Sequence, residues 1–396
     1  MRLNSLRIRN FRMLDDFQVP SLGRVNLIVG RNNSGKSTVL EAIRILAARG
    51  NPRLLLSVLT DHDETAVLES DPLGLREEQI ANGFKYLFPE RRFPAIDDFA
   101  IRIGDTSSDL LKIEHLFFRT ESEEVRDGEG ELFENRLKRI LISKSDPNGL
   151  SADGVGQALR ISNGSNPTIS RSTFIEFDSV RSRLRHPLWD AGVISEIPCS
   201  FIPTHFIPQT DLSDLWDRVS LTSFEDKVLG AMRLIEPKLR GMAFIKAPIA
   251  VPATNMRRTE ARIPVVKLEG SDERIPLNSM GDGMLRVLQL VLAILPAKGG
   301  FLLIDEFENG LYYGVQEAVW KMVFELAAEL DIQVFATTHS QDCINSFTQA
   351  AQKHPEEGVL FKLSRSRATS DEGKIIATVY SEEQLAFASE TEMEVR

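Results

Sequence analysis

The chain has 396 residues, of which 42% are hydrophobic and 26% are charged, a composition typical of a folded globular protein. Its formal net charge of -10 excludes indiscriminate binding of nucleic acid by the whole surface, although a local basic patch is compatible with it. Cys199 and Cys343 lack metal-ligand spacing and provide no disulfide framework, and no apolar run approaches the length of a membrane span. We expect a cytoplasmic protein with no membrane partner.

The first elements suggest a sheet that leads into a helix. Residues 6–9 alternate between apolar and basic side chains, which predicts a half-buried strand. The apolar run 25–29 predicts a central strand that leads directly into Gly30. After Ser37, apolar residues recur at helical spacing, and Gly50 is a natural end for that helix.

The pattern changes between residues 73 and 199, where strands and helices no longer alternate. Antiparallel strands are predicted at 99–105 and 110–121, followed by a charged helix at about 131–141. The polar stretch 143–157 has the composition of a surface loop. We interpret residues 73–199 as an enlarged side lobe or an insertion.

The remainder returns to helices and apolar strands. A helical region is predicted at 211–240, with strands near 243–248, 263–268, 301–305 and 333–339 and a helix at 315–330. Apolar strands joined by a helix imply a parallel sheet. The expected fold class is α/β, with a mostly parallel core sheet, an antiparallel side lobe and a helical or irregular insertion. The expected divisions are 1–72, 73–199 and 200–396.

Residues 30–37, GRNNSGKS, match the phosphate-loop pattern G-x-x-x-x-G-K-[ST] between a strand and a helix. Backbone N–H groups in such a loop surround phosphate oxygens, the lysine reaches the β- and γ-phosphates, and the serine hydroxyl binds Mg²⁺. A glycine-rich turn without a ligand is the alternative, and the length and placement of the motif argue against it. The predicted ATP-binding residues here are Gly30, Asn32, Asn33, Ser34, Gly35, Lys36, Ser37 and Thr38.

A second set of candidates follows the strands at 301–305 and 333–339. Asp305 is suited to hold Mg²⁺ through water, and Glu306 to orient or deprotonate the attacking water. Many strands end in solvated acids, but the phosphate loop favours the catalytic interpretation. His339 lies at a carboxyl strand end, where parallel sheets place ligands, so we favour a contact with the γ-phosphate over a structural role.

The order of phosphate loop, IDEFENGL and TTHS resembles the ABC-type ATPases of the RecF, SMC and OLD group. The opening LRIRNFRMLDDFQV is similar to the first strands of that group, before its phosphate loop. The segment LWDRVSLTSFEDKVLGAMRLIEP and the end of the chain, YSEEQLAFASETEMEVR, are similar to stand-alone OLD-like ATPases of bacteria. The resemblance covers roughly residues 1–50 and 200–396. It implies the fold of an ABC-type ATPase head, with ATP, Mg²⁺ and a homo-oligomer built on ATP-sandwich dimers.

The resemblance also assigns roles to further residues. Ser279, Gly281 and Gly283 correspond to the signature with which one subunit closes the ATP site of another. Asn10 and Arg12 correspond to residues that approach the nucleotide. Residues 308–311, including Asn309, correspond to the D-loop, and Gln209 is the candidate for the glutamine that senses Mg²⁺ and the γ-phosphate.

The signature assignment has a simpler alternative. The stretch SMGDG is also a plausible helix start, with Ser279 or Asp282 as its cap. The two interpretations are compatible, because a signature helix needs a cap as well.

The chain departs from the OLD pattern at its end. Only 57 residues follow His339, too few for a Toprim nuclease domain, and they contain no Asp-x-Asp pair. Residues 61–64, DHDE, imitate a metal cluster, but we interpret them as a solvated loop because the flanking sequence offers no scaffold. The sequence therefore predicts an ATPase without its own nuclease.

Two functions are compatible with such an ATPase. The resemblance to the ATPases of anti-phage operons, of which the PARIS type is one example, implies a sensor or scaffold that controls a separate Toprim-like nuclease or toxin. The alternative is a RecF-like ATPase that binds DNA for repair. Basic clusters that bear on this are Arg136-Lys138-Arg139, Arg181-Arg183-Arg185-His186 and Arg257-Arg258-Arg262. The second is the best candidate for phosphate contacts, because no acid interrupts it.

Overall fold

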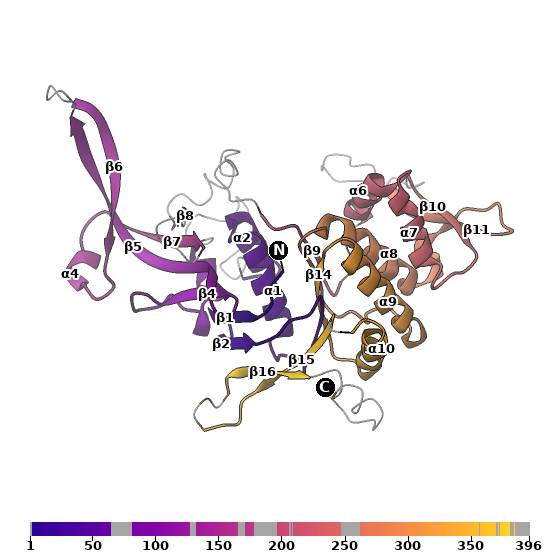
Figure 1. The fold of residues 1–396 in the computed structure, drawn as a ribbon. Helices are drawn as coiled ribbons and strands as arrows, with labels where there is room; N and C mark the ends of the chain where they lie inside the picture. The colour runs from indigo at the N-terminus through magenta and orange to yellow at the C-terminus, as the bar shows by residue number, and fades with distance from the viewer. Residues whose placement is uncertain are drawn as a thin grey trace.

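The structure is a computed structural model. It describes residues 2–64, 81–126, 132–164, 171–177, 196–205, 207, 209–246, 262–355, 357–369, 371, 373–380 and 384. Three sheets and their helices form the body, and a long hairpin projects from it (Figure 1).

A mostly parallel sheet lies at the centre, with strand order β16-β15-β3-β14-β13-β9. Its strands are β3 (Val25–Val29), β9 (Cys199–Ile202), β13 (Phe301–Ile304), β14 (Gln333–Thr338), β15 (Gly358–Arg365) and β16 (Ile375–Tyr380). Only β16 runs antiparallel to its neighbour. Every residue of β3, β13 and β14 is buried, which confirms the central strands expected from their apolar runs.

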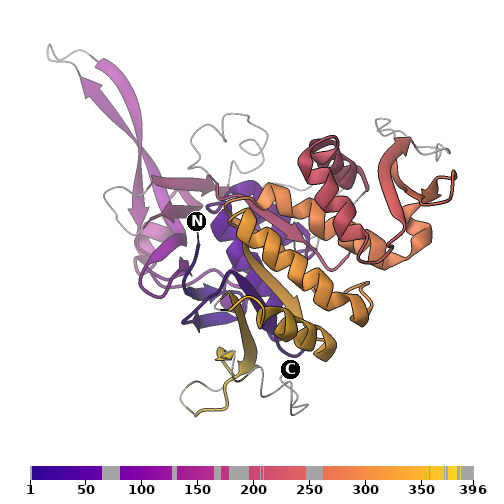
Figure 2. The ribbon, with the colours of Figure 1, turned by 45° about the vertical axis from the view of Figure 1, so that its right-hand side comes forward.

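Helices cover one face of this sheet, and two helices with a second sheet cover the other. Leu27, Leu302 and Val334 face a core that includes α6 (Gln209–Val219), α7 (Ser223–Met232), α8 (Asp282–Ile294), α9 (Tyr313–Glu329) and α10 (Gln341–Ala351). Ile28 and Leu303 face a core that includes α1 (Lys36–Ala47) and α2 (Pro52–Thr60). Figure 2 shows the orange and yellow helices stacked beside the sheet. The strands are apolar throughout because both faces are covered.

The second sheet is antiparallel, with strand order β2-β1-β4-β5-β7-β8 and β6 paired with β5. Its strands are β1 (Leu6–Phe11), β2 (Leu14–Val19), β4 (Ala100–Gly104), β5 (Asp109–Arg126), β6 (Leu132–Ile142), β7 (Val155–Asn163) and β8 (Arg171–Glu176). The antiparallel strands expected at 99–105 and 110–121 are confirmed as β4 and part of β5. Because β1 pairs with β4, this lobe includes strands from both sides of residue 72.

The helix predicted at 131–141 is wrong, because this segment is strand β6. It pairs with β5 from Phe117 opposite Ile142 to Arg126 opposite Leu132, and the two strands form the projecting hairpin (Figure 1). The register places Glu121 opposite Lys138, an opposite-charge pair that stabilises a sheet. The charged residues that suggested a helix therefore pair across strands with residues of β5.

The remaining elements surround these two sheets. The loop expected at 143–157 contains the short helix α4 (Pro147–Leu150) and the first residues of β7, so it is only partly irregular. A third sheet consists of β10 (Leu239–Lys246), β11 (Arg262–Leu268) and β12 (Ile275–Pro276). The described residues also form the 3-10 turns η1 (Phe84–Leu87), η2 (Pro89–Arg91), η5 (Leu277–Met280) and η6 (Leu295–Ala297). Among the described residues, no helix is both long and apolar enough to cross a membrane.

Candidate functional site

The phosphate loop joins the end of β3 to the start of α1 with a backbone that requires glycine. Gly30 and Gly35 have φ values of +153° and +95°, and a Cβ on Gly30 would lie 2.7 Å from the Ser34 hydroxyl and 2.8 Å from the Leu363 carbonyl. Asn33 also has a positive φ of 59°, a conformation that asparagine tolerates better than most residues. The loop thus presents the positive end of α1 without a side-chain cap.

Two groups in this loop are suited to bind an anion. The Lys36 ammonium donates to the carbonyl oxygens of Gly30 (2.8 Å) and Arg31 (3.1 Å). Burial lowers the pKa of Lys36, while the nearby acids Asp305, Glu306 and Glu308 act in the opposite direction. The Ser34 hydroxyl is buried and has no hydrogen-bond partner in the part of the chain that is described. Both groups gain a partner if a phosphate occupies the loop.

The first acid after β13 meets the phosphate loop directly. The Ser37 hydroxyl donates to Asp305 at 3.0 Å, although the two residues are 268 positions apart. Hydroxyls of Thr337 and Thr204 donate to the same carboxylate at 2.6 Å and 3.2 Å. These are hard oxygen donors, the kind of ligand that Mg²⁺ prefers. The site therefore fits Mg²⁺, which binds through few protein oxygens plus phosphates and water.

Glu306 lies beside this cluster in a strained turn. Its φ is 48°, in the left-handed region, and its backbone N–H donates to the Thr337 hydroxyl at 2.9 Å. The carboxylate is one-third exposed and lies 3.6 Å from Nδ1 of His339. The turn therefore presents the acid at the open carboxyl edge of the sheet, where the phosphate loop also opens.

His339 is held by a second acid that the sequence analysis placed only on the D-loop. Glu308 Oε1 accepts the backbone N–H of His339 at 3.1 Å and lies 3.3 Å from its Nδ1. Glu308 is 12% exposed and His339 is 50% exposed, so the ring stands on a buried support. The sequence shows only that an acid, Glu308, lies two positions after Glu306. Its pairing with His339 depends on the tertiary fold and could not be predicted from the local sequence.

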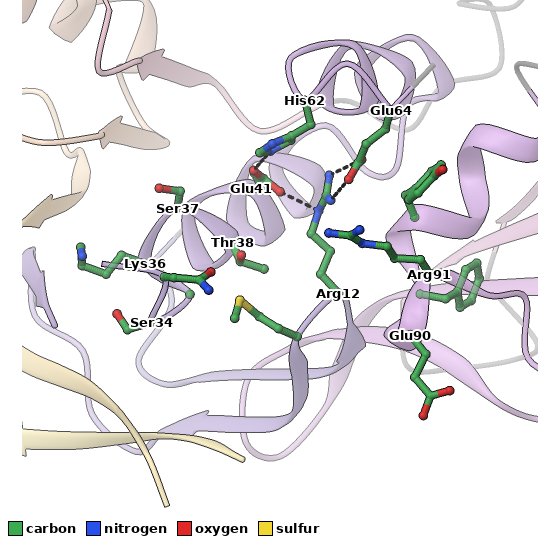
Figure 3. Close-up of a pocket in the computed structure, with 15 residues that line it drawn as sticks. Arg12, Ser34, Lys36, Ser37, Thr38, Glu41, His62, Glu64, Glu90 and Arg91 are labelled. Atoms are coloured by element: carbon green, nitrogen blue, oxygen red, sulfur yellow. Dashed lines mark hydrogen bonds and ion pairs between the residues drawn. The ribbon is translucent and has the colours of Figure 1, made fainter. Parts of the chain in front are cut away.

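A cavity of about 630 Å³ extends from the phosphate loop to the antiparallel lobe. Figure 3 shows Ser34 and Lys36 on one side of it and Arg12 and Arg91 on the other. Its lining is completed by residues from α1, the β1–β2 turn, the segment after α2 and the turns η1 and η2, among them Met13, Glu41, His62, Glu64, Tyr86, Phe88 and Glu90. Its size is typical of a small-ligand site.

Arg12 lines this cavity, as its predicted approach to a nucleotide requires, but Asn10 does not. The Arg12 guanidinium pairs with Glu41 at 2.9 Å and with Glu64 at 2.6 Å. The Asn10 amide instead donates to the Ala100 carbonyl at 2.9 Å, which joins β1 to β4. Asn10 therefore supports the lobe and lies outside the cavity lining.

The interpretation of residues 61–64 as a solvated loop is only partly right. Asp61 and Asp63 are exposed, but Glu64 is nearly buried against Arg12. His62 lies 2.5 Å from Glu41, a hydrogen bond that raises the pKa of the imidazole. The end of α2 brings these two side chains to the turn between β1 and β2, a contact between distant segments that the local sequence does not reveal.

The SMGDG stretch forms an exposed turn before α8. The helix begins at Asp282, and neither Ser279 nor Asp282 makes a capping bond; Gly281, with φ 92°, occupies the cap position. The helix start expected at this stretch is confirmed, but the expected cap residues are wrong, because Gly281 has no side chain with which to cap the helix. A Cβ on Gly283 would lie 3.1 Å from the carbonyl of Gly310, so the turn packs on the segment 308–311. In that segment, the Asn309 amide donates to the Thr204 carbonyl at 2.6 Å.

The other predicted residues are placed less completely. Asn32 is exposed in the phosphate loop, and Thr38 follows Ser37 in the first turn of α1 and lines the cavity. Gln209 is the first residue of α6, and its side chain lies outside the described part of the structure.

The three basic clusters lie only partly within the described residues. The second cluster, residues 181–186, lies outside the described residues, as do Arg257 and Arg258. Arg139 and Arg262 are engaged within the chain, with Glu176 and Asp217 respectively.

Comparisons with known proteins support ATPase activity. Residues 1–151 match the family described as AAA ATPase domain, and residues 257–343 match the family described as AAA domain, putative AbiEii toxin, Type IV TA system. The chain is 22% identical over 404 residues to an ATP/GTP phosphatase of Helicobacter pylori, with 98% of each chain covered.

The chain is also similar to a second protein sequence and to a solved structure. An uncharacterized protein of Methanocaldococcus jannaschii, MJECL11, is 30% identical over 112 residues, which is 28% of this chain and 94% of that protein. This chain belongs to the same family as that protein. A solved SMC head bound to the C-winged helix domain of ScpA aligns with 96% of this chain and 98% of its own, at 13% identity and a TM-score of 0.45.

Proposed function

The chain is an ATPase that carries AAA domain sequence in two separate parts, and we propose that it hydrolyses Mg²⁺-bound ATP in sites that two copies complete together. The observation that carries the chemistry is the 3.0 Å contact between Ser37 and Asp305. It joins the phosphate loop to the acidic strand end, and these are the two halves of an Mg²⁺–phosphate site.

Each residue at the sheet edge has a distinct role in this proposal. The loop N–H groups, Ser34 and Lys36 bind the phosphates, and Ser37 and Asp305 hold the metal. Mg²⁺ neutralises negative charge on the β- and γ-phosphate oxygens when it is bound. Glu306 accepts a proton from the attacking water, while His339 donates a hydrogen bond toward the γ-phosphate.

The cavity beyond Arg12 accommodates the nucleoside end of ATP. It is continuous with the phosphate loop, and Tyr86 and Phe88 supply aromatic surface. Because Glu41 and Glu64 balance the Arg12 charge, this end of the cavity suits a neutral base and ribose better than a second anion.

An exposed face supports completion of the site by a second copy. Ser279, Gly281 and Asn309 are exposed, and the turn that bears the first two packs on segment 308–311. Beyond that segment, Tyr312 and Tyr313 are 64% and 58% exposed. Exposed aromatic side chains beside a polar turn are typical of a protein interface.

We further propose that this ATP cycle controls a separately encoded effector, a toxin or Toprim-like nuclease, in anti-phage defence. The resemblance to OLD-like ATPases supports this role. ATP-driven closure of two copies provides a switch that an effector can read.

The ATP chemistry is tested by phosphate release from the purified chain with and without Mg²⁺. We expect Mg²⁺-dependent release in the wild type and none in the Lys36→Ala variant. Release that persists in Lys36→Ala would remove the phosphate loop from the reaction.

The biological role is tested by phage challenge of bacteria that carry the gene with its neighbours. Protection that is lost with Lys36→Ala and with deletion of a neighbouring toxin or nuclease gene supports the defence role. ATP-stimulated, salt-sensitive binding of duplex DNA without such protection would favour the DNA-repair role instead.

A further inference from the structure

Arg286, on α8, is a buried charge that the proposed chemistry does not yet use. It is 1% exposed, and it is one of the largest fully buried side chains among the described residues. Burial of a guanidinium is costly unless its N–H groups are hydrogen-bonded. The position of this charge therefore needs a specific explanation.

The guanidinium bonds to three backbone carbonyls at the acidic edge of the sheet. Nη1 donates to Pro203 at 3.0 Å, and Nη2 donates to both Asp305 and Glu306 at 2.8 Å. Burial lowers the pKa of Arg286 to about 10, while the carboxylates of Glu308, Asp305 and Glu306 act in the opposite direction. The side chain is therefore a cation at neutral pH.

These bonds hold the backbone on both sides of a strained residue. Glu306 adopts a left-handed conformation, which is strained for a residue other than glycine. Its N–H is fixed by Thr337, and its carbonyl and the preceding one are fixed by Arg286. Without the guanidinium, the Asp305 carbonyl would lose its bond to Arg286, and the Glu306 carbonyl would keep the bond from the Asn309 N–H at 3.0 Å.

We propose that Arg286 is a positioning residue for ATP hydrolysis, acting by holding the Asp305–Glu306 turn that aims the Glu306 carboxylate. The inference rests on the proposed role of Glu306 as the base. Arg286 lies four residues after Asp282, at the start of the same helix, so it also links the exposed SMGDG turn rigidly to the acidic strand end. A shift of about 1 Å at a reacting group is enough to reduce turnover roughly 100-fold.

The test uses two replacements at one position and a matched control. Arg286→Lys keeps the charge and Arg286→Gln keeps an N–H donor, but neither has the guanidinium fork. Gln289→Met is the control, because Gln289 is also fully buried on α8 and its amide has no partner within the described residues. Unfolding temperature, affinity for a non-hydrolysable ATP analogue with Mg²⁺, and kcat are measured for each.

We expect the Arg286 variants to bind the analogue within about threefold of wild type while kcat falls roughly 100-fold. Gln289→Met should match wild type in affinity and kcat. In a Glu306→Gln background, measured by single turnover, the Arg286 replacements should cause no further loss, because they act through Glu306.

Three results would overturn the proposal. The first is a kcat of the Arg286 variants within twofold of wild type. The second is an equal loss of kcat on replacing Arg286 in the wild-type and Glu306→Gln backgrounds. The third is failure of both Arg286 variants to fold, which would show that Arg286 is needed for folding. Failure of the proposed function is distinguishable, since it requires that wild type lack activity or that Glu306→Gln retain it.

Discussion

The carboxyl edge of the parallel sheet and the aromatic cluster around His115 in the antiparallel lobe differ in how they bury a basic side chain. At the sheet edge, the side chains of Lys36 and Arg286 donate to backbone carbonyls, and nearby carboxylates raise the pKa of each against the lowering effect of burial. In the lobe, His115 stacks on Phe93 at 4.2 Å and beside Phe177 at 5.8 Å, and burial lowers its pKa to about 4. The lobe therefore buries a neutral ring.

We therefore expect changes in the two regions to affect different properties, the reaction rate at the sheet edge and the stability of the fold in the lobe. Charges held in strained positions contribute to chemistry, so changes at the sheet edge should alter turnover more than folding. Packed neutral rings contribute to stability, so changes in the lobe should alter folding and leave turnover intact. The predictions below test this division, from the largest expected effect to the smallest.

Glu306→Gln removes the proposed base while keeping the size of the side chain. We expect turnover to fall about 10²- to 10⁴-fold, because the attacking water loses its proton acceptor. ATP affinity and unfolding temperature should stay at wild-type values. Phosphate release and nucleotide binding measure the two effects, and wild-type turnover would exclude Glu306 as the base.

His115 should make the lobe sensitive to acid. Its pKa in the folded chain, about 4, lies below the ordinary 6.5, so the folded state binds fewer protons between these values. The stabilising contribution is present above pH 6.5 and is lost as the pH falls toward 4. Between pH 7 and pH 5 the loss amounts to about 2 kcal/mol.

His115→Phe keeps an aromatic ring but cannot be protonated. Its free energy of unfolding, measured with urea, should therefore fall less than that of wild type between pH 7 and pH 5. ATP turnover at pH 7.5 should be unchanged. An equal pH dependence in both proteins would show that His115 does not titrate as the lobe unfolds.

Tyr312 and Tyr313 test whether the exposed face binds a second copy. Their rings lie 4.3 Å apart, and Gly314 gives the Tyr312 ring room, since a Cβ there would lie 2.7 Å from it. Replacing both by serine should weaken the ATP-dependent dimer about 30-fold, the effect of one interface hot spot. Sedimentation at several concentrations measures this change.

The tyrosine prediction has an internal control. Because both rings are exposed in the single chain, the variant should keep the unfolding temperature and the ATP affinity of wild type. A dimer of undiminished affinity would place the contact between copies elsewhere.

Sequence patterns predicted the sheet edge better than the lobe. β3, α1, β13 and β14 carry strong apolar periodicity, because each is buried by the sheet and its covering layers. Strand β6 was predicted as a helix, because its structure depends on pairing with β5 and its own charge pattern does not reveal that partner.

The same distinction applies within the site. Lys36, Ser37 and Asp305 could be predicted to meet, because a motif and the topology of a parallel sheet bring them together. The contacts of Glu308, Thr337 and Glu64 depend on tertiary packing that no local pattern reports. Arg286 is a lone basic residue in the apolar run MLRVLQLVLAI, a pattern that indicates a buried arginine. The pattern does not indicate which carbonyl groups the arginine contacts.

Mixing two inactive variants tests the central claim, that each ATP site belongs to two chains. Ser279→Arg should fold and bind ATP, because Ser279 is exposed, but its signature face should fail to close a neighbour's site. Lys36→Ala lacks the phosphate-binding lysine but keeps its signature. In a mixed dimer, one site combines an intact loop with an intact signature.

An equal mixture of Ser279→Arg and Lys36→Ala should therefore recover about a quarter of wild-type phosphate release, because half of the dimers are mixed and each has one complete site. Each variant alone should be inactive. A mixture that forms dimers yet releases no phosphate, or normal turnover by Ser279→Arg alone, would contradict the claim that two copies complete each site.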